Sequence, residues 1–136
     1  MYELFEHTAD LGLRIRAADL NQLFADAAQA LFAALVNDLT GVRLIEQRHF
    51  SIEEDQLDYL LVDWLSELLY RFATEHMLFA AFDTQVSPQG LTAVARGEPL
   101  DPSRHELGHE VKAITYHGLT VGRSNAGWLA EVIVDI

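Results

Sequence analysis

Cysteine is absent from this 136-residue chain, lysine occurs only once, and no apolar run approaches the thickness of a bilayer. Without cysteine there is no disulfide and no thiolate metal site, which fits the reducing cytoplasm. A membrane-spanning helix needs about 20 apolar residues, so no membrane association is expected. The stretch Met1–Glu6 lacks the positive region and cleavage site of a signal peptide. A cytoplasmic protein is therefore predicted.

Basic residues are scarce as well. Nine Lys and Arg residues stand against 21 Asp and Glu residues, which gives a net charge of −12. Because such a surface repels a phosphate backbone, direct nucleic-acid binding is not expected. Two explanations of the charge stay open. It can simply keep the protein in solution, or it can fit the chain to a basic partner, such as a protein that itself holds RNA.

Half of the residues are hydrophobic, enough for one substantial core in a single domain spanning residues 1–136. Two segments have the three- and four-residue apolar spacing that is typical of amphipathic helices. The first runs from about Leu20 to Val36, with Asp19 as its N-terminal cap. The second starts at Asp55 and ends near Phe72 or Glu75.

Most of the remaining apolar segments have the composition of β-strands. They are Tyr2–Phe5, Leu11–Ile15, Val42–Ile52, Leu78–Val86, Leu91–Arg96, Val111–Tyr116 and Trp128–Ile136. The late connections are too short for crossovers, so antiparallel pairs should dominate. The expected fold class is α+β, a single domain of mostly antiparallel sheet with two main helices packed on it.

The last stretch, Trp128–Ile136, is β-branched and apolar, which is typical of a strand buried on both faces. Asp135 and the terminal carboxylate of Ile136 place two negative charges at one end of that strand, and Asp10 supplies a third acid after the first apolar run. If the three converge, a hard divalent cation would offset their repulsion, which favours Ca²⁺, Mg²⁺ or Mn²⁺. Lys112 is the other candidate to neutralise part of the charge. Alternatively, Asp10 is a turn acid and the tail frays into water.

A second pattern competes with this hypothesis. The segment His105–His109 matches the H-E-x-x-H motif of zinc metallopeptidases, in which both histidines share one helix face and the glutamate, here Glu106, reaches a zinc-bound water. Gly108 is a typical helix terminator, and the residues after it have strand composition. A loop with two unrelated histidines is the favoured interpretation, and a zinc metallohydrolase is the alternative function.

Other titratable residues are further candidates for supporting positions around the acid cluster. These are His7, Asp63, His105 and His117. A hydrolytic site made from His7, Asp63 and His117 is also conceivable, although nothing in their spacing favours it. Asp63 lies on the more polar side of the second helix, where a solvated ion-pair role competes with a role in the site.

Taken together, these residues resemble the archease family. The matching stretches are Glu6–Asp10, Leu60–Tyr70, Gly97-Glu98 with Asp101 and Arg104-His105, Glu110–His117 and Val132–Ile136, which span the chain in the family's order. Small departures, such as Ser66 where Asn is usual, do not touch the proposed site.

The resemblance implies an accessory protein and not an enzyme. Archeases assist the RtcB-type RNA ligase of tRNA splicing and RNA repair by promoting its guanylation by GTP and its repeated turnover, so GTP and RNA would be met only through the ligase. The resemblance also implies a calcium-like ion held by Asp10, Asp135 and Ile136, and a functional lysine at Lys112. It places His105 in a family motif unrelated to zinc peptidases. A chaperone-like role toward RNA-modifying enzymes is a secondary implication.

Overall fold

The structure is a computed structural model that describes residues 1–7 and 10–136, with only the backbone of His7 included. In chain order its elements are β1 (Tyr2–His7), β2 (Asp10–Ala17), α1 (Leu20–Leu35), the 3-10 helix η1 (Leu39–Gly41), β3 (Glu46–Glu53), α2 (Leu57–Glu75), β4 (Met77–Ser87), β5 (Gly90–Pro99), β6 (Ala113–Ile114), β7 (Thr120–Ser124) and β8 (Gly127–Asp135).

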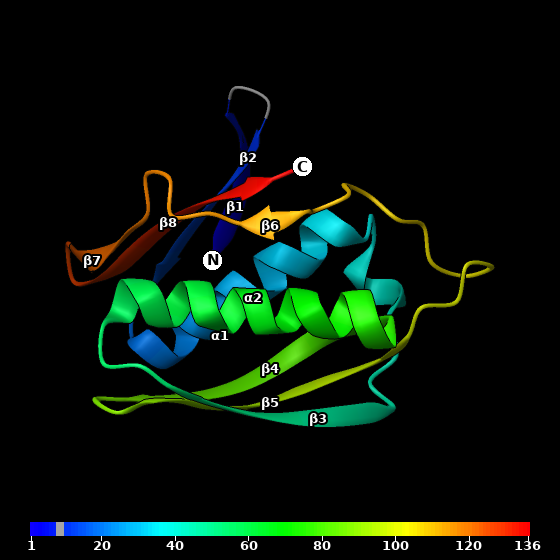
Figure 1. Cartoon of the computed structure of the whole chain (residues 1–136), viewed down its shortest axis with the longest axis horizontal. Helices are drawn as coiled ribbons and strands as arrows, with labels where there is room; N and C mark the ends of the chain where they lie inside the picture. The colour runs from blue at the N-terminus through cyan, green and yellow to red at the C-terminus, as the bar shows by residue number, and fades with distance from the viewer. Residues whose placement is uncertain (8–9) are drawn as a thin grey trace.

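Two antiparallel sheets enclose the two helices (Figure 1). The larger sheet has five strands, in the order β1-β2-β8-β6 with β7 also paired to β8, and the smaller has the order β3-β5-β4. In Figure 1 both helices lie between the larger sheet above and the smaller sheet below, with α2 in front. The expected α+β class with two helices and antiparallel sheets is confirmed.

Helix α1 forms the middle of the hydrophobic core. Asp19 caps it, because its side chain accepts a hydrogen bond of 2.8 Å from the backbone N–H of Gln22. The helix is buried on most of its circumference, since it packs against strands of both sheets. Helix α2 is attached to it by Trp64, which is fully buried and donates its indole N–H to the carbonyl of Phe24 at 3.0 Å.

Strands β4 and β5 approach each other closely at Gly97. A Cβ atom at this position would lie 1.7 Å from the carbonyl oxygen of Leu78, so no side chain fits there. The β4–β5 register also shifts between Phe79 and Ala81. Gly97 therefore sets the path of the end of β5, which carries the buried carboxylate of Glu98.

The local predictions fail mainly at strand boundaries. The strand expected over Val42–Ile52 begins only at Glu46, because residues 39–41 turn as a 3-10 helix and the N–H of Arg43 bonds to the Glu98 side chain instead of a neighbouring strand. The strand expected over Val111–Tyr116 pairs with β8 only at Ala113 and Ile114. In the described part of the chain, no helix is both long and apolar enough to cross a bilayer.

Candidate ion-binding and partner-binding site

The larger sheet brings the start and the end of the chain together. Strand β2 pairs with β8 in a register that sets Asp10 directly opposite Asp135. Directly opposed residues of an antiparallel pair point to the same face. Because side chains alternate along a strand, the two acids lie on the face away from Leu11 and Val134, which are buried in the core. The predicted juxtaposition of these two acids is present.

Lys112 joins the acids from a third segment. Its backbone N–H donates to the carbonyl of Asp135 at 2.7 Å, and the next residue, Ala113, is the partner of Asp135 in the β6–β8 pair. The Lys112 side chain is exposed. Figure 1 shows the C-terminus beside the ends of β2 and β6. The backbone therefore sets Asp10, Lys112 and Asp135 at one end of the larger sheet, and we refer to these residues as the acid–lysine cluster.

The tail of the chain is held in place. Val132, Ile133 and Val134 are all buried, so this half of β8 is covered on both faces as predicted. The side chain of Ile136 is partly buried and packs against the core. The alternative of a tail that frays into water is therefore wrong, because β8 is paired on both sides and anchored beyond its last paired residue.

An apolar row borders the acids on the same sheet face. The ring of Phe5 covers Gly12, where a Cβ atom would lie 2.2 Å from the ring, and Ile133 beside it is only 5% exposed. Removing water from one side of two like charges strengthens their repulsion. The donors are all oxygens, which fits a hard divalent ion. Among the described side chains, those of residues 1–6 and 10–136, no three His, Asp or Glu gather closely enough to hold a metal. The expected set has two such side chains plus the carboxylate of Ile136.

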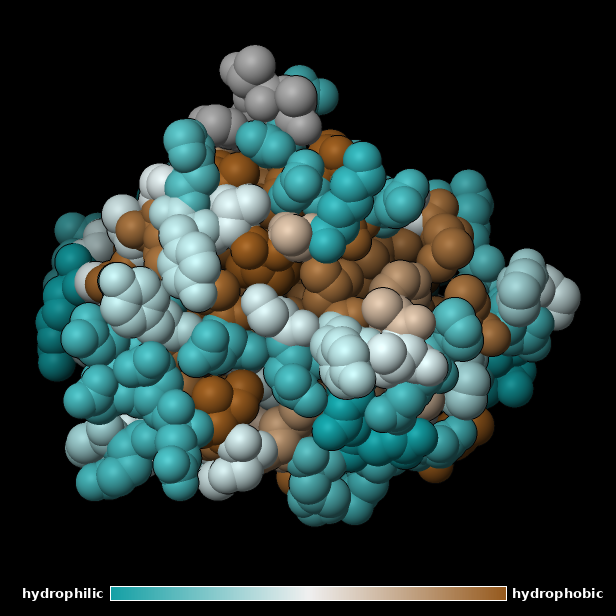
Figure 2. Space-filling view, viewed as in Figure 1, coloured by the Kyte–Doolittle hydropathy of each residue, from teal (hydrophilic) through white to brown (hydrophobic). Residues whose placement is uncertain are grey.

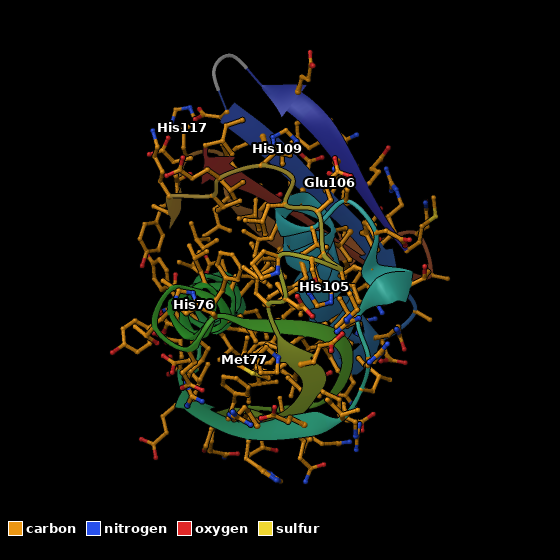
Figure 3. The ribbon with its side chains drawn as sticks, turned by 90° about the vertical axis from the view of Figure 1, so that its right-hand side faces the viewer. His76, Met77, His105, Glu106, His109 and His117 are labelled. Carbon is orange, nitrogen blue, oxygen red and sulfur yellow. The ribbon has the colours of Figure 1, made fainter. Side chains whose placement is uncertain are left out.

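The H-E-x-x-H segment is not a helix. His105 and Glu106 follow a turn at residues 102–104, and the backbone N–H groups of Gly108 and His109 bond to carbonyls at the end of α1, those of Leu35 and Ala34, at 2.8 Å each. His105 is 6% exposed, whereas His109 is exposed. Figure 3 shows the two histidines apart, with His105 near the middle of the view and His109 higher, toward the β1–β2 hairpin. The shared helix face that a zinc peptidase needs is absent, so the metallohydrolase interpretation is wrong.

His105 instead belongs to a buried hydrogen-bond network around Glu98. The Glu98 carboxylate accepts bonds from the N–H of Arg43 at 2.7 Å, from His105 Nε2 at 3.0 Å and from the Arg104 guanidinium. His105 Nδ1 accepts from the N–H of Asp101 at 2.9 Å, so its proton is on Nε2 and the ring is neutral. Burial favours a raised pKa for Glu98, but the three donors outweigh it and lower that pKa below its ordinary value.

Two of the other candidate supporting residues, Asp63 and His105, are engaged elsewhere. Asp63 lines a hollow of about 400 Å³ together with Ile52 and Tyr70, and no residue of the acid–lysine cluster lines it. Burial, and secondly the charge of Glu54, raise the pKa of Asp63. His117 is exposed in the turn after β6, with its N–H on Thr115 Oγ1 at 3.2 Å. The side chain of His7 lies outside the described residues. The ring of His105 is engaged with Glu98, so neither it nor Asp63 sits beside Asp10 and Asp135.

Comparison with known proteins decides the family. The model of the Archease protein family (MTH1598/TM1083) matches residues 2–136. The chain belongs to the archease family. Archeases of Methanopyrus kandleri and Pyrococcus abyssi are 41% and 39% identical to it, over 99% of this chain and 99% and 98% of those proteins.

Solved archease structures have the same fold. The solution structure of Methanobacterium thermoautotrophicum protein 1598 superposes with a TM-score of 0.86 at 35% identity, covering 99% of this chain and 98% of that one. A Thermotoga maritima archease, described as a possible chaperone, superposes with a TM-score of 0.68 at 19% identity over 100% of this chain and 98% of that one, a likeness of fold alone.

Two features of this archease were not predicted as structural units. The Glu98 network depends on contacts between residues far apart in sequence, such as Arg43 with Glu98, which no local pattern reveals. The contact between Tyr59 and Tyr116 joins α2 to the turn after β6. Part of the Glu98 network could have been predicted, because Asp101, Arg104 and His105 have the spacing of a single turn. In the structure, the N–H of Arg104 donates to the Asp101 carbonyl at 2.9 Å.

Proposed function

We propose that this archease is an accessory protein that activates an RtcB-type RNA ligase in the cytoplasm, promoting its guanylation by GTP and its multiple turnover in tRNA splicing, without catalysing a reaction itself. The observation that carries the proposal is the acid–lysine cluster, in which Asp10 and Asp135 are paired in register and Lys112 is bonded to the backbone of Asp135. Buried networks and core residues elsewhere have structural roles, whereas these three charged side chains have no part in the core.

The cluster is suited to hold a divalent ion. Asp10, Asp135 and the carboxylate of Ile136 would be its ligands, and their all-oxygen chemistry favours Ca²⁺, with Mg²⁺ or Mn²⁺ as alternatives. When bound, such an ion supplies positive charge that offsets the repulsion between the carboxylates and can be shared with a phosphate. The chain's contribution is to fix Asp10 and Asp135 on neighbouring strands, so that little rearrangement is needed on binding.

Charge also favours the proposed partner. With a net charge of −12, the archease is attracted to the basic surface of a protein that handles RNA, and RNA and GTP are reached only through that protein. Lys112 is exposed, and its ammonium would contact a phosphate of GTP once the cluster enters the ligase active site. The proposed function involves no membrane.

A guanylation assay tests it. The cognate ligase is incubated with limiting GTP and either the wild-type archease or the variants Asp10→Ala, Lys112→Ala and Asp135→Ala. Each variant should stimulate guanylation at least about tenfold less than the wild type, as expected for a charged group that contacts a transferring nucleotide. Glu106→Gln removes one exposed charge outside the cluster and should stimulate like the wild type. Stimulation that all three cluster variants retain in full would rule the proposal out.

A chaperone-like role is the second candidate, because the Thermotoga relative is described as a possible chaperone. It predicts that the archease binds several unrelated client proteins, and that Asp10→Ala and Asp135→Ala leave this binding unchanged. Pull-down of defined RNA-modifying enzymes with wild-type and variant archease separates the two roles.

A further inference from the structure

Two tyrosines contact each other on the surface of this archease. Tyr59, in the first turn of α2, is 45% exposed, and Tyr116, after β6, is 60% exposed. Their ring centroids are 5.8 Å apart at an interplanar angle of 74°, an edge-to-face contact. The contact orients the two rings toward each other, while about half of their surface stays in water. Rigid, exposed aromatic rings of this kind are typical of the residues that dominate protein–protein binding energy.

The tyrosine pair lies close to the acid–lysine cluster. Lys112 and Tyr116 belong to one segment that runs along β8, so their Cα atoms are at most about 13 Å apart in extended chain. A standard protein interface covers about 800 Å² on each partner, a patch of roughly 16 Å radius. A protein that covers the cluster and continues over the edge strand β6 would also reach Tyr116.

Apolar residues lie in the same β6–β7 region as Tyr116. Figure 2 shows brown, hydrophobic surface gathered across the middle of this face, over the region between α2 and strands β6 and β8 of Figure 1. Ile114, Leu119 and Val121 are partly buried apolar residues of the β6–β7 region, which packs against α2. An apolar centre with exposed aromatic rings is the composition of an interface core.

Acidic residues stand close in the chain to both tyrosines. The segment of Tyr116 begins at Lys112 of the acid–lysine cluster, and a run of acids precedes and enters the first turn of α2, which holds Tyr59: Glu53, Glu54, Asp55 and Asp58. None of these four makes a salt bridge with a described residue. The fitting partner therefore has an apolar pocket with a basic rim. A second copy of this chain would set the same acid runs against each other, and RNA would be repelled.

We infer that the Tyr59–Tyr116 pair, with the apolar surface around it, is the docking surface through which this archease holds the ligase. The inference rests on the proposed function. It assigns different tasks to neighbouring surfaces: the tyrosines supply affinity for the ligase, and the acid–lysine cluster supplies the stimulation of guanylation.

The experiment measures the affinity of the immobilised cognate ligase for the archease by biolayer interferometry. The variants are Tyr59→Ser, Tyr116→Ser and the double variant, and the control is Tyr70→Ser. Tyr70 is a fair match because it lies on the same helix and is 60% exposed, but it borders the separate hollow with Asp63. Thermal melts and calcium titrations of every variant test whether its fold and its ion site are intact.

We expect the double variant to raise Kd for the ligase by about thirtyfold or more, each single variant by about tenfold, and Tyr70→Ser by less than about twofold. Saturating concentrations of the double variant should restore normal guanylation, because the cluster is intact. Unchanged affinity of the double variant, with wild-type binding present, overturns this inference alone. No ligase binding by the wild type overturns both proposals. A wild-type dimer that the double variant dissociates assigns the surface to a second copy and also overturns the inference.

Discussion

Replacing Asp135 with Asn should make the ion-free archease more stable. The side chains of Asp10 and Asp135 are directly opposite each other, and such pairs have Cβ atoms about 4.5–5.5 Å apart. Two carboxylates at this spacing repel each other by about 1 kcal/mol in water and by about 3 kcal/mol at an effective dielectric constant of 20. Asp135 is exposed, so the lower value is the better guide. The variant should therefore gain about 1 kcal/mol, or about 3–5 °C in Tm for a domain of this size.

Calcium should reverse the order of the melting temperatures of the wild type and Asp135→Asn. An ion that binds only the folded state stabilises it by about 2.7 kcal/mol at 100 times its Kd. The wild type should gain this free energy, whereas Asp135→Asn, which keeps only one of the two aspartates, should gain little. In excess chelator the variant melts at the higher temperature, and in excess calcium the wild type does.

Differential scanning calorimetry in chelator and in a calcium series measures both effects on the same samples. Glu106→Gln serves as the control, because it removes one exposed carboxylate from the irregular segment after His105 and should follow the wild type in both solutions. Two results would refute the reasoning. One is a variant that melts below the wild type without the ion, and the other is a variant that gains as much from calcium as the wild type does.

Two further predictions concern the structure around β5. Glu98→Gln should lower the free energy of unfolding by about 3 kcal/mol near neutral pH, because it removes the charge that the Arg43 N–H and Arg104 bind in a buried place. Since the pKa of Glu98 is lowered from 4.5, its stabilisation is complete above that pH and is lost as the pH falls through the folded-state pKa. Urea unfolding should therefore show the unfolding free energies of the wild type and the variant converging in acid. A difference between them that stays constant with pH would contradict the assignment. Gly97→Ala should lower Tm by more than about 10 °C, because the new Cβ would meet the Leu78 carbonyl at 1.7 Å. Gly122→Ala, where nothing lies within 4 Å, should melt close to the wild type, and equal melting of the two variants would show that the β4–β5 contact is unimportant.

The acid–lysine cluster could be predicted from the sequence because charge and strand composition coincide there. Asp135 ends an apolar strand and Asp10 begins one, so pairing the two strands brings the acids together. The position of Lys112 could not be obtained in this way, since it depends on a backbone hydrogen bond to Asp135 from a segment that is mostly irregular. Charge alone made Lys112 a candidate to neutralise part of the acid cluster, and only its expected role in ligase activation came from the family resemblance.

The helices were predicted more accurately than the strand boundaries. The expected helix from Leu20 to Val36 differs from α1 by only one residue. The prediction is accurate because apolar periodicity and the Asp19 cap are local signals. The start of β3 and the short length of β6 depend on which distant strand supplies a partner, and a linear pattern does not contain that information. The irregularity of His105–His109 could be predicted from Gly108, because glycine commonly ends helices. In the structure, a Cβ atom at Gly108 would lie 2.7 Å from the carbonyl of Ala34.

The place of β8 in the larger sheet has a consequence for how the molecule is made. β8 is the last strand in the sequence but sits between β2 and β6–β7, so the pair that closes the sheet joins opposite ends of the chain. Local hairpins such as β1–β2 and β4–β5 can form early, but β2 presents an unpaired edge until β8 arrives. Non-local pairing of this kind folds slowly. Newly synthesised chains should therefore be most prone to aggregate just before their final strand is inserted.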